Sequence, residues 1–123
     1  MASNKTVRFG PVAVAATVGN IINPPTLAGG TGLAGANAAT YVILRHIRIV
    51  NKSAAAVTFS GYIGLTGGSA AGTEFLGTGL SIAGNTPYDW HGLVRLDTAD
   101  FFSGLASAAT SLTIQGEGEI GIV

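Results

Sequence analysis

Apolar and polar residues alternate along the stretch from Val57 to Thr66, which is the pattern of a β-strand with one buried face. The residues predicted to point inward are Val57, Phe59, Ile63 and Leu65, and those predicted to point outward are Thr58, Ser60, Tyr62 and Thr66. A period of two over this length excludes a helix for the segment. It makes the chain a candidate all-β protein.

The preceding stretch, Tyr41 to Val50, is apolar on both faces. One face carries Ile43, Ile47 and Ile49, and the other carries Val42, Leu44 and Val50 together with His46 and Arg48. Turn-forming residues from Asn51 to Ala55 separate it from the next strand. We therefore expect the two strands to pair as a hairpin.

Several other short extended segments are predicted, each bounded by Gly, Pro, Asn or Ser. They are Thr6 to Gly19 (an edge strand broken at Gly10-Pro11), Glu74 to Leu76, Leu80 to Ile82, Tyr88 to Leu96 and Leu112 to Val123. The last segment places Gln115, Glu117 and Glu119 on one face. The only helix expected is one capped turn from Asp97 into Phe101 and Phe102. About seven or eight such strands predict a single β-sandwich of jelly-roll type.

The chain is long enough for one domain and too short for two. Residues 1–40 are predicted to form an N-terminal edge strand and a Gly- and Ala-rich arm, and residues 41–123 the β-sandwich. The arm from Asn23 to Thr40 has no periodicity, and past Pro25 its only large apolar residues are Leu27 and Leu33. Because these are too few for a private core, we expect the arm to be an assembly element that contacts another subunit or the surface on which the protein assembles.

Charged residues are scarce, and none occurs from Phe9 to Leu44. Only 10% of the residues are charged, whereas a soluble domain ordinarily has roughly a quarter. This predicts that much of the surface meets a neighbour, as in a homo-oligomer. Six basic and six acidic residues give a net charge of zero, which argues against nucleic acid and anionic membranes as partners.

No pattern in the chain predicts catalysis. The segment Gly30 to Gly35 matches G-x-G-x-x-G, but no strand precedes it and no helix follows it, so we predict no nucleotide site. No serine lies in a G-x-S-x-G turn. Cysteine is absent, which excludes a disulfide framework, a thiolate nucleophile and a cysteine-based metal site.

His46, Asp89 and His91 are the plausible ingredients of a metal or acid–base site. Asp89 and His91 point the same way on a strand, but nothing in the sequence brings His46 to them. We therefore predict no catalytic residue, no cofactor and no metal. A small metal enzyme of cupin-like shape is kept as a distant alternative.

The charged and aromatic residues that remain are candidates for an interface. Arg45, Arg48 and Lys52 form a small basic cluster, and Glu117 and Glu119 share a face of another segment. These groups are either solvated surface or partners across a subunit boundary. Trp90 is a candidate core or interface anchor or, alternatively, a sugar-stacking platform. The complete candidate interface set is Leu27, Leu33, Arg45, His46, Arg48, Trp90, Glu117 and Glu119.

Four segments resemble small virion structural proteins of tailed bacteriophages. They are Tyr41 to Lys52, Tyr62 to Phe75, Asp89 to Phe101 and Gly116 to Val123, and the likeness covers roughly Asn23 to Val123. The resemblance implies a β-rich capsid decoration (cement) protein, or another surface component of the head or tail. It carries no catalytic signature.

The function expected from the sequence is therefore that of a capsid decoration protein that binds the assembled head and stabilises it. Its partners would be the major capsid protein or other virion proteins and further copies of itself, with a trimer favoured. It would be made in the host cytoplasm and located on the virion surface. The alternative is a tail or adhesion component that contacts a host glycan.

Overall fold

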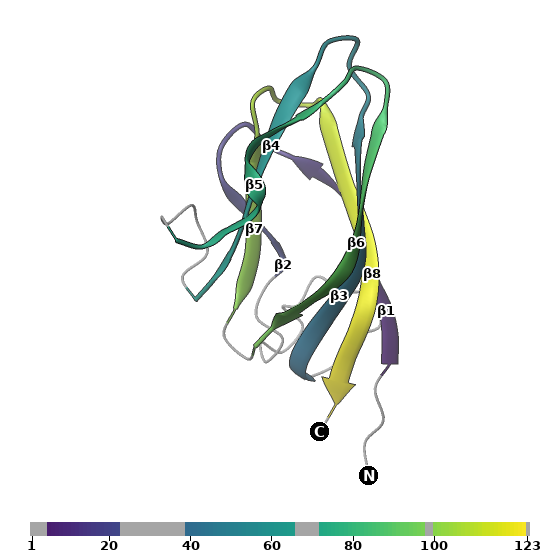
Figure 1. The fold of residues 1–123 in the computed structure, drawn as a ribbon, viewed down its shortest axis with the longest axis vertical. Coiled ribbons are helices and arrows are strands. Elements are labelled where there is room, and N and C mark those ends of the chain that lie inside the picture. The colour runs from purple at the N-terminus through teal and green to yellow at the C-terminus, as the bar shows by residue number, and fades with distance from the viewer. Residues whose placement is uncertain (1–4, 23–38, 66–71, 98–99, 123) are drawn as a thin grey trace.

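The computed structural model describes residues 5–22, 39–65, 72–97 and 100–122, and they form two antiparallel sheets that face each other (Figure 1). The described part of the chain contains no helix. The prediction of an all-β sandwich is confirmed. The arm with Leu27 and Leu33 lies outside the described residues, apart from Ala39 and Thr40, which begin a strand.

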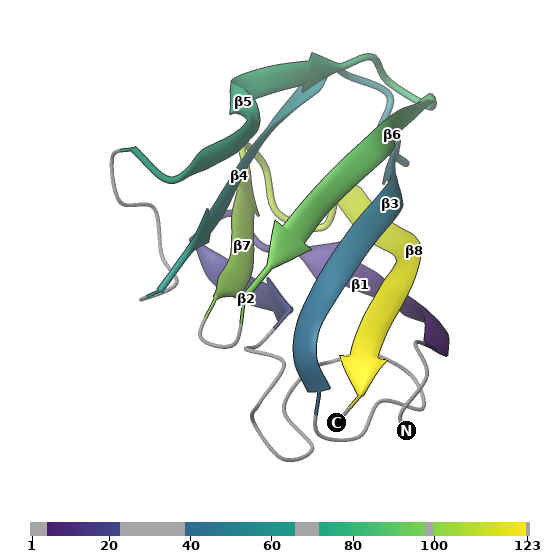
Figure 2. The same ribbon diagram turned by 60° about the horizontal axis from the view of Figure 1, so that its bottom comes forward.

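Each sheet has four strands. Sheet A has the order β1-β8-β3-β6 and sheet B the order β2-β7-β4-β5. The strands are β1 (Lys5–Val14), β2 (Gly19–Ile22), β3 (Ala39–Asn51), β4 (Val57–Gly64), β5 (Glu74–Ile82), β6 (Pro87–Leu96), β7 (Phe101–Ala106) and β8 (Leu112–Ile122). Figure 2 shows β1, β8, β3 and β6 side by side in one layer, with the second layer behind it.

The predicted hairpin between β3 and β4 is wrong, because these two strands belong to different sheets. The chain crosses from one sheet to the other at the turn after Asn51. The Asn51 side chain is fully buried and donates to the carbonyls of Ala55 and Ile82, both at 2.9 Å. It thereby ties the crossing to the end of β5. Turn residues predict a reversal of the chain but not the sheet to which it returns.

A β-bulge in β3 changes which of its residues face the core. The register with both neighbouring strands shifts between Leu44 and His46. Val42 and Leu44 are therefore buried on the same side as Ile47 and Ile49, and all four are fully buried. The predicted division of these residues between two faces is wrong, because the extra residue at the bulge reverses the alternation.

The core lies between the sheets and is apolar. Its largest fully buried members include Phe9, Phe59 and Phe102, one from each of three strands. Val57 and Phe59 are buried as predicted, whereas Leu65 lies beyond the end of β4 and is 68% exposed. Among the described strands, β1 pairs with β8 alone and lies at the edge of sheet A, as predicted.

The predicted helical turn into Phe101 and Phe102 is wrong at both residues, because β7 begins at Phe101. Phe102 is fully buried and pairs with Ile63 of β4 and Ile22 of β2. Burial of a large aromatic ring between two neighbouring strands outweighs a local capping preference. The Asp97 amide donates to the Asp100 carboxylate at 2.8 Å, and Thr98 and Ala99 between them lie outside the described residues.

Candidate functional site

The outward side of sheet A, here called the polar face, gathers charged residues from all four of its strands. The register aligns Arg8, Glu117, His46 and His91 in one row across β1, β8, β3 and β6. A second row places Gln115, Arg48 and Asp89 on β8, β3 and β6. The fold therefore brings together side chains that are up to 109 positions apart in the chain, between Arg8 and Glu117.

Charge is divided unequally between the two sheets. Each strand of sheet A contains two charged residues, whereas the strands of sheet B contain one in all, Glu74. Charged groups are costly to bury without partners. The polar face carries most of the few charges in these strands, so it is the side suited to contact water or a polar partner.

Arg45 is the extra residue of the bulge in β3, and its side chain reaches Glu119 of β8. The Nη1 atom of Arg45 lies 3.3 Å from Oε2 of Glu119, and both side chains are partly exposed. The bulge points Arg45 and His46 outward in succession. This pair was predicted only as two separate clusters, and the structure joins them within one chain.

Asp89 is the centre of a second group. Its Oδ1 accepts a hydrogen bond from Nε of Arg48 at 2.8 Å, and its Oδ2 accepts one from Nη2 of Arg48 at 3.1 Å. Oδ1 also lies 2.8 Å from Nε2 of His46. An ionised carboxylate only accepts hydrogen bonds, so Nε2 of His46 carries the proton.

The contacts between Asp89 and Arg48 shift the pKa values of both residues. The hydrogen bond from Arg48 and then that from His46 lower the pKa of Asp89 from 3.8 to about 2. The same hydrogen bond, together with the charge of Asp89, raises the pKa of Arg48. The two parallel hydrogen bonds hold the Arg48 guanidinium in one orientation relative to Asp89.

His46 and His91 stack on each other, with ring centroids 4.5 Å apart and an angle of 12° between the ring planes. Sequence reasoning gave no means of bringing His46 to Asp89 and His91, and the pairing of β3 with β6 supplies it. Ring lone pairs lie in the ring planes, so two parallel rings do not converge on one ion. Among the described residues, no group of three or more metal-ligating side chains is present.

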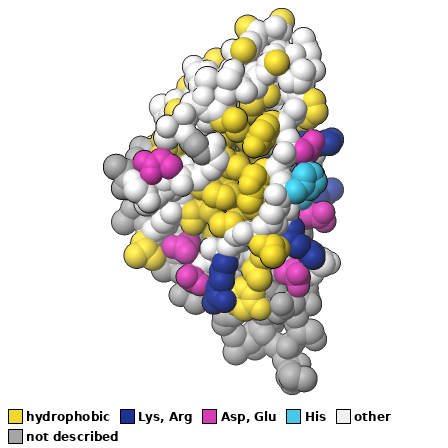
Figure 3. Space-filling model, in the orientation of Figure 1, with side chains coloured by type: hydrophobic (Ala, Val, Ile, Leu, Met, Phe, Trp, Pro, Cys, Tyr) yellow, Lys and Arg dark blue, Asp and Glu magenta, His cyan; other side chains and the backbone are white. Residues whose placement is uncertain are grey.

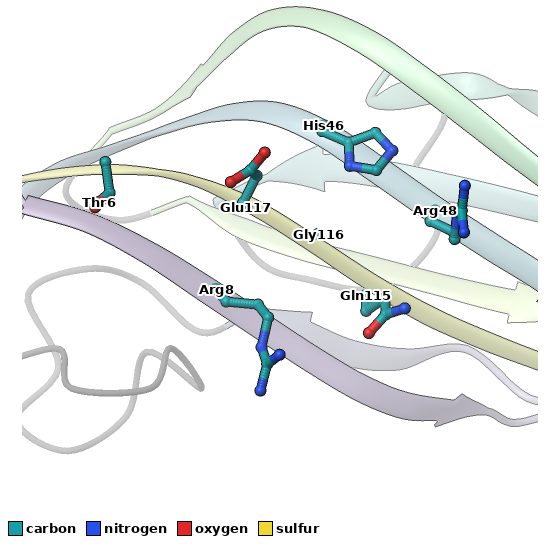
Figure 4. A pocket seen from close by; sticks show the side chains of 7 residues that line it. All are labelled: Thr6, Arg8, His46, Arg48, Gln115, Gly116 and Glu117. Atoms are coloured by element: carbon teal, nitrogen blue, oxygen red, sulfur yellow. The ribbon is translucent and has the colours of Figure 1, made fainter.

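A hollow of about 540 Å³ lies over β8, between the side chains of β1 and β3. It is lined by Thr6, Arg8, His46, Arg48, Gln115, Gly116 and Glu117 (Figure 4). Figure 4 shows the Arg8 side chain pointing away from β8, while the Glu117 carboxylate lies on the other side of that strand, toward β3. Within the described part of the chain, neither Arg8 nor Glu117 has an ion pair within 4.0 Å.

Trp90 lies on the other side of β6 from Asp89 and His91. It pairs in register with the buried Ile47 and packs edge-on against Phe75 of β5, with ring centroids 5.2 Å apart. Phe75 and Trp90 are among the partly buried hydrophobic residues that pack against the core. Figure 3 shows a continuous apolar area in the middle of this face of the molecule. Trp90 is thus half-buried at the margin of the core.

The structure assembles five of the eight predicted interface residues on the polar face: Arg45, His46, Arg48, Glu117 and Glu119. Trp90 lies apart from them, and Leu27 and Leu33 fall outside the described residues. Sequence reasoning did not select Arg8, Gln115 or Thr6. The signal that identifies them is the pairing of β1 with β8, and a single sequence does not reveal which strands pair.

No family model matches the chain. No curated protein matches it either. Among solved structures, the chain is similar to one from infectious bursal disease virus, Gx strain, with a TM-score of 0.42 and 6% sequence identity. The match covers 97% of this chain and 28% of the viral chain, so this chain spans less than a third of that chain's length. No helix among the described residues has the length and hydropathy needed to cross a bilayer.

Proposed function

We propose that this chain is a structural subunit of a bacteriophage virion, a capsid decoration protein that binds the assembled head and stabilises it. The observation that supports this most is the strand order, β1-β8-β3-β6 facing β2-β7-β4-β5. This distribution of eight antiparallel strands over two sheets supports a sandwich of jelly-roll type, a fold that recurs in viral capsid domains. The resemblance to virion proteins over roughly Asn23 to Val123 supports the same function.

A fold alone does not decide function, since jelly rolls also occur in lectins and cupins. What supports a non-enzymatic protein is the interior of the sandwich. The described core cluster is wholly hydrophobic, and both histidines lie on the outward side of sheet A instead of between the sheets. A cupin-like metal enzyme would need its ligands inside.

The mechanism of stabilisation would be mass action. A subunit that binds only the assembled lattice lowers the free energy of that lattice, by an amount that grows with the logarithm of the subunit concentration relative to its dissociation constant. Many weakly bound copies add up when the subunits are themselves joined as a homo-oligomer. The partners are thus the major capsid protein or other virion proteins and further copies of this chain, as expected from the sequence.

The glycan-contacting alternative gains no support from Trp90. A stacking platform presents the flat face of an aromatic ring to solvent, whereas the Trp90 ring packs against Phe75 and the core. The polar hollow over β8 is built from charged and amide side chains and has no aromatic face other than His46.

Gold-labelled antibodies against the chain, applied to purified virions of the phage that encodes it, test the proposal by electron microscopy. Label over the head surface is the expected result. Label confined to the tail would support the adhesion alternative, and virions without label would refute a virion role. Heads from a phage that lacks the gene, with and without added protein, would then show whether occupancy raises the temperature at which the shell opens.

A further inference from the structure

Arg8 and Glu117 stand directly opposite each other in the register of β1 and β8, yet they form no ion pair. Both side chains are exposed. Every other described acidic side chain on the polar face has a basic partner within the chain: Glu119 pairs with Arg45, and Asp89 with Arg48. Among the side chains that the structure describes, the polar face thus presents one uncommitted cation, Arg8, and one uncommitted anion, Glu117, on adjacent strands.

We propose that the polar face pairs with the same face of a second copy of this chain, with Arg8 of each copy bound to Glu117 of the other. The rule for such isologous contacts is that if position i meets position j, position j meets position i. A two-fold axis that runs parallel to the strands, between β1 and β8, exchanges these two positions because they are register partners. No second type of subunit is needed to satisfy both charges.

The neighbouring rows are compatible with the same axis. Thr6 is opposite Glu119, and Ala13 is opposite Thr113. The axis would place the Thr6 hydroxyl over the partner copy's carboxylate, and small side chains would meet in the Ala13 row. On the outward side, β1 carries hydrogen-bond donors and β8 carries carboxylates. When the two-fold axis places β1 of one copy over β8 of the other, donors therefore face acceptors.

This contact supplies a defined surface for the homo-oligomer of the proposed function. The inference rests on that function only in assuming that the chain self-associates. A two-fold contact alone forms a dimer. It joins two trimers back to back if the trimer favoured from the sequence uses another surface. Because the contact is tested with purified protein, its failure is distinguishable from the failure of a role on the virion.

Charge reversal at each position tests the contact. Arg8→Glu and Glu117→Arg each place two pairs of like charges across the two-fold axis, and like charges in contact are strongly unfavourable. Sedimentation equilibrium is expected to show each single variant associating more than about tenfold more weakly than the wild type. Lys52→Glu is the matched control, because Lys52 is an exposed cation in the turn after β3, outside the polar face. It should associate like the wild type.

Mixing the two variants distinguishes a contact between chains from one within a chain. In a mixed pair, each contact joins position 8 of one variant to position 117 of the other, and these two positions carry opposite charges. Association should therefore return on mixing and also in the double variant. An ion pair within one chain predicts rescue in the double variant only. A wild type that stays monomeric through the micromolar range, single variants that associate normally, or a mixture that fails to associate would each overturn the proposal.

Discussion

The Phe9 ring of β1 covers Gly116 of β8, its direct partner across the strands. A Cβ atom added to Gly116 would lie 2.6 Å from Cε1 of Phe9 and would also meet the carbonyl oxygen of His46. An aromatic ring over a strand glycine fills the space that a side chain would otherwise occupy. This close approach lets β8 lie against β3 while Gln115 and Glu117, on either side of Gly116, point outward into the polar face.

Gly116→Ala is therefore expected to lower the free energy of unfolding by about 3 kcal/mol, because either Phe9 or the backbone of β3 must move. Gly19→Ala is the matched control, since nothing lies within 4 Å of the added Cβ at that position of β2. Its effect should stay within about 0.5 kcal/mol. Urea unfolding of both variants checks this, and equal effects would show that the contact at Gly116 is unimportant.

Asp89 should make stability depend on pH in the acid range. Its pKa in the folded chain is about 2, below the ordinary 3.8. A carboxyl group with a lowered pKa stabilises the fold while ionised, so this contribution is complete above about pH 4 and is lost as the pH falls toward about 2. Wild type should exceed Asp89→Asn in unfolding free energy at about pH 5, and the difference should narrow by about pH 2.

Unfolding curves for the two proteins at several pH values in that range measure this difference directly. A constant gap between wild type and Asp89→Asn would mean that the carboxylate contributes no ionisation-dependent stability. A gap that widened on acidification would mean that the direction of the pKa shift is wrong.

Trp90 is predicted to act on stability and not on a ligand. Trp90→Ala should lower the unfolding free energy by about 2–3 kcal/mol, because the ring packs against Phe75 and the core while remaining half-exposed. Leu93→Ala on the same strand is the control, since Leu93 is 75% exposed and should change stability by less than about 0.5 kcal/mol. If both variants unfold like the wild type, Trp90 is available for another role.

Local patterns predicted the strands well but not the way they are joined. The alternation of residue types predicted which residues of β8 point outward, as far as Glu119. The Gly10-Pro11 break predicted that β1 is an edge strand. The β3–β4 hairpin did not form, because strand alternation says which face is buried but not which sheet receives the strand. The bulge at Arg45, which the pairing of β3 with β8 reveals, left no sequence signature, and it reversed the faces of half of β3.

The same limitation applies to the site. Arg45, Arg48, Glu117 and Glu119 were identifiable as scarce charges on strand faces. The partners of Arg45, Arg48 and Glu119 were not, because each of these ion pairs joins strands that are far apart in the sequence. Arg8 was overlooked for that reason, since its importance depends on the pairing of β1 with β8.

Asn51 provides the last prediction, because it holds the crossing between the sheets. Its Oδ1 accepts hydrogen bonds from the amide and the hydroxyl of Ser53, at 2.9 and 2.7 Å, and its Nδ2 donates to two carbonyls. Asn51→Ala would leave the carbonyls of Ala55 and Ile82 without this donor and should cost about 2–3 kcal/mol of unfolding free energy.

Ser53→Ala is the informative comparison, since it removes only the hydroxyl and keeps both hydrogen bonds from Nδ2 of Asn51. Its cost should be about 1 kcal/mol. Asn51→Asp should be more harmful than either, because a buried carboxylate would face two carbonyl oxygens and must either take up a proton or repel them. If thermal unfolding ranked Ser53→Ala as the most damaging of the three, the hydroxyl of Ser53, and not the Asn51 amide, would be what joins the two sheets at this crossing.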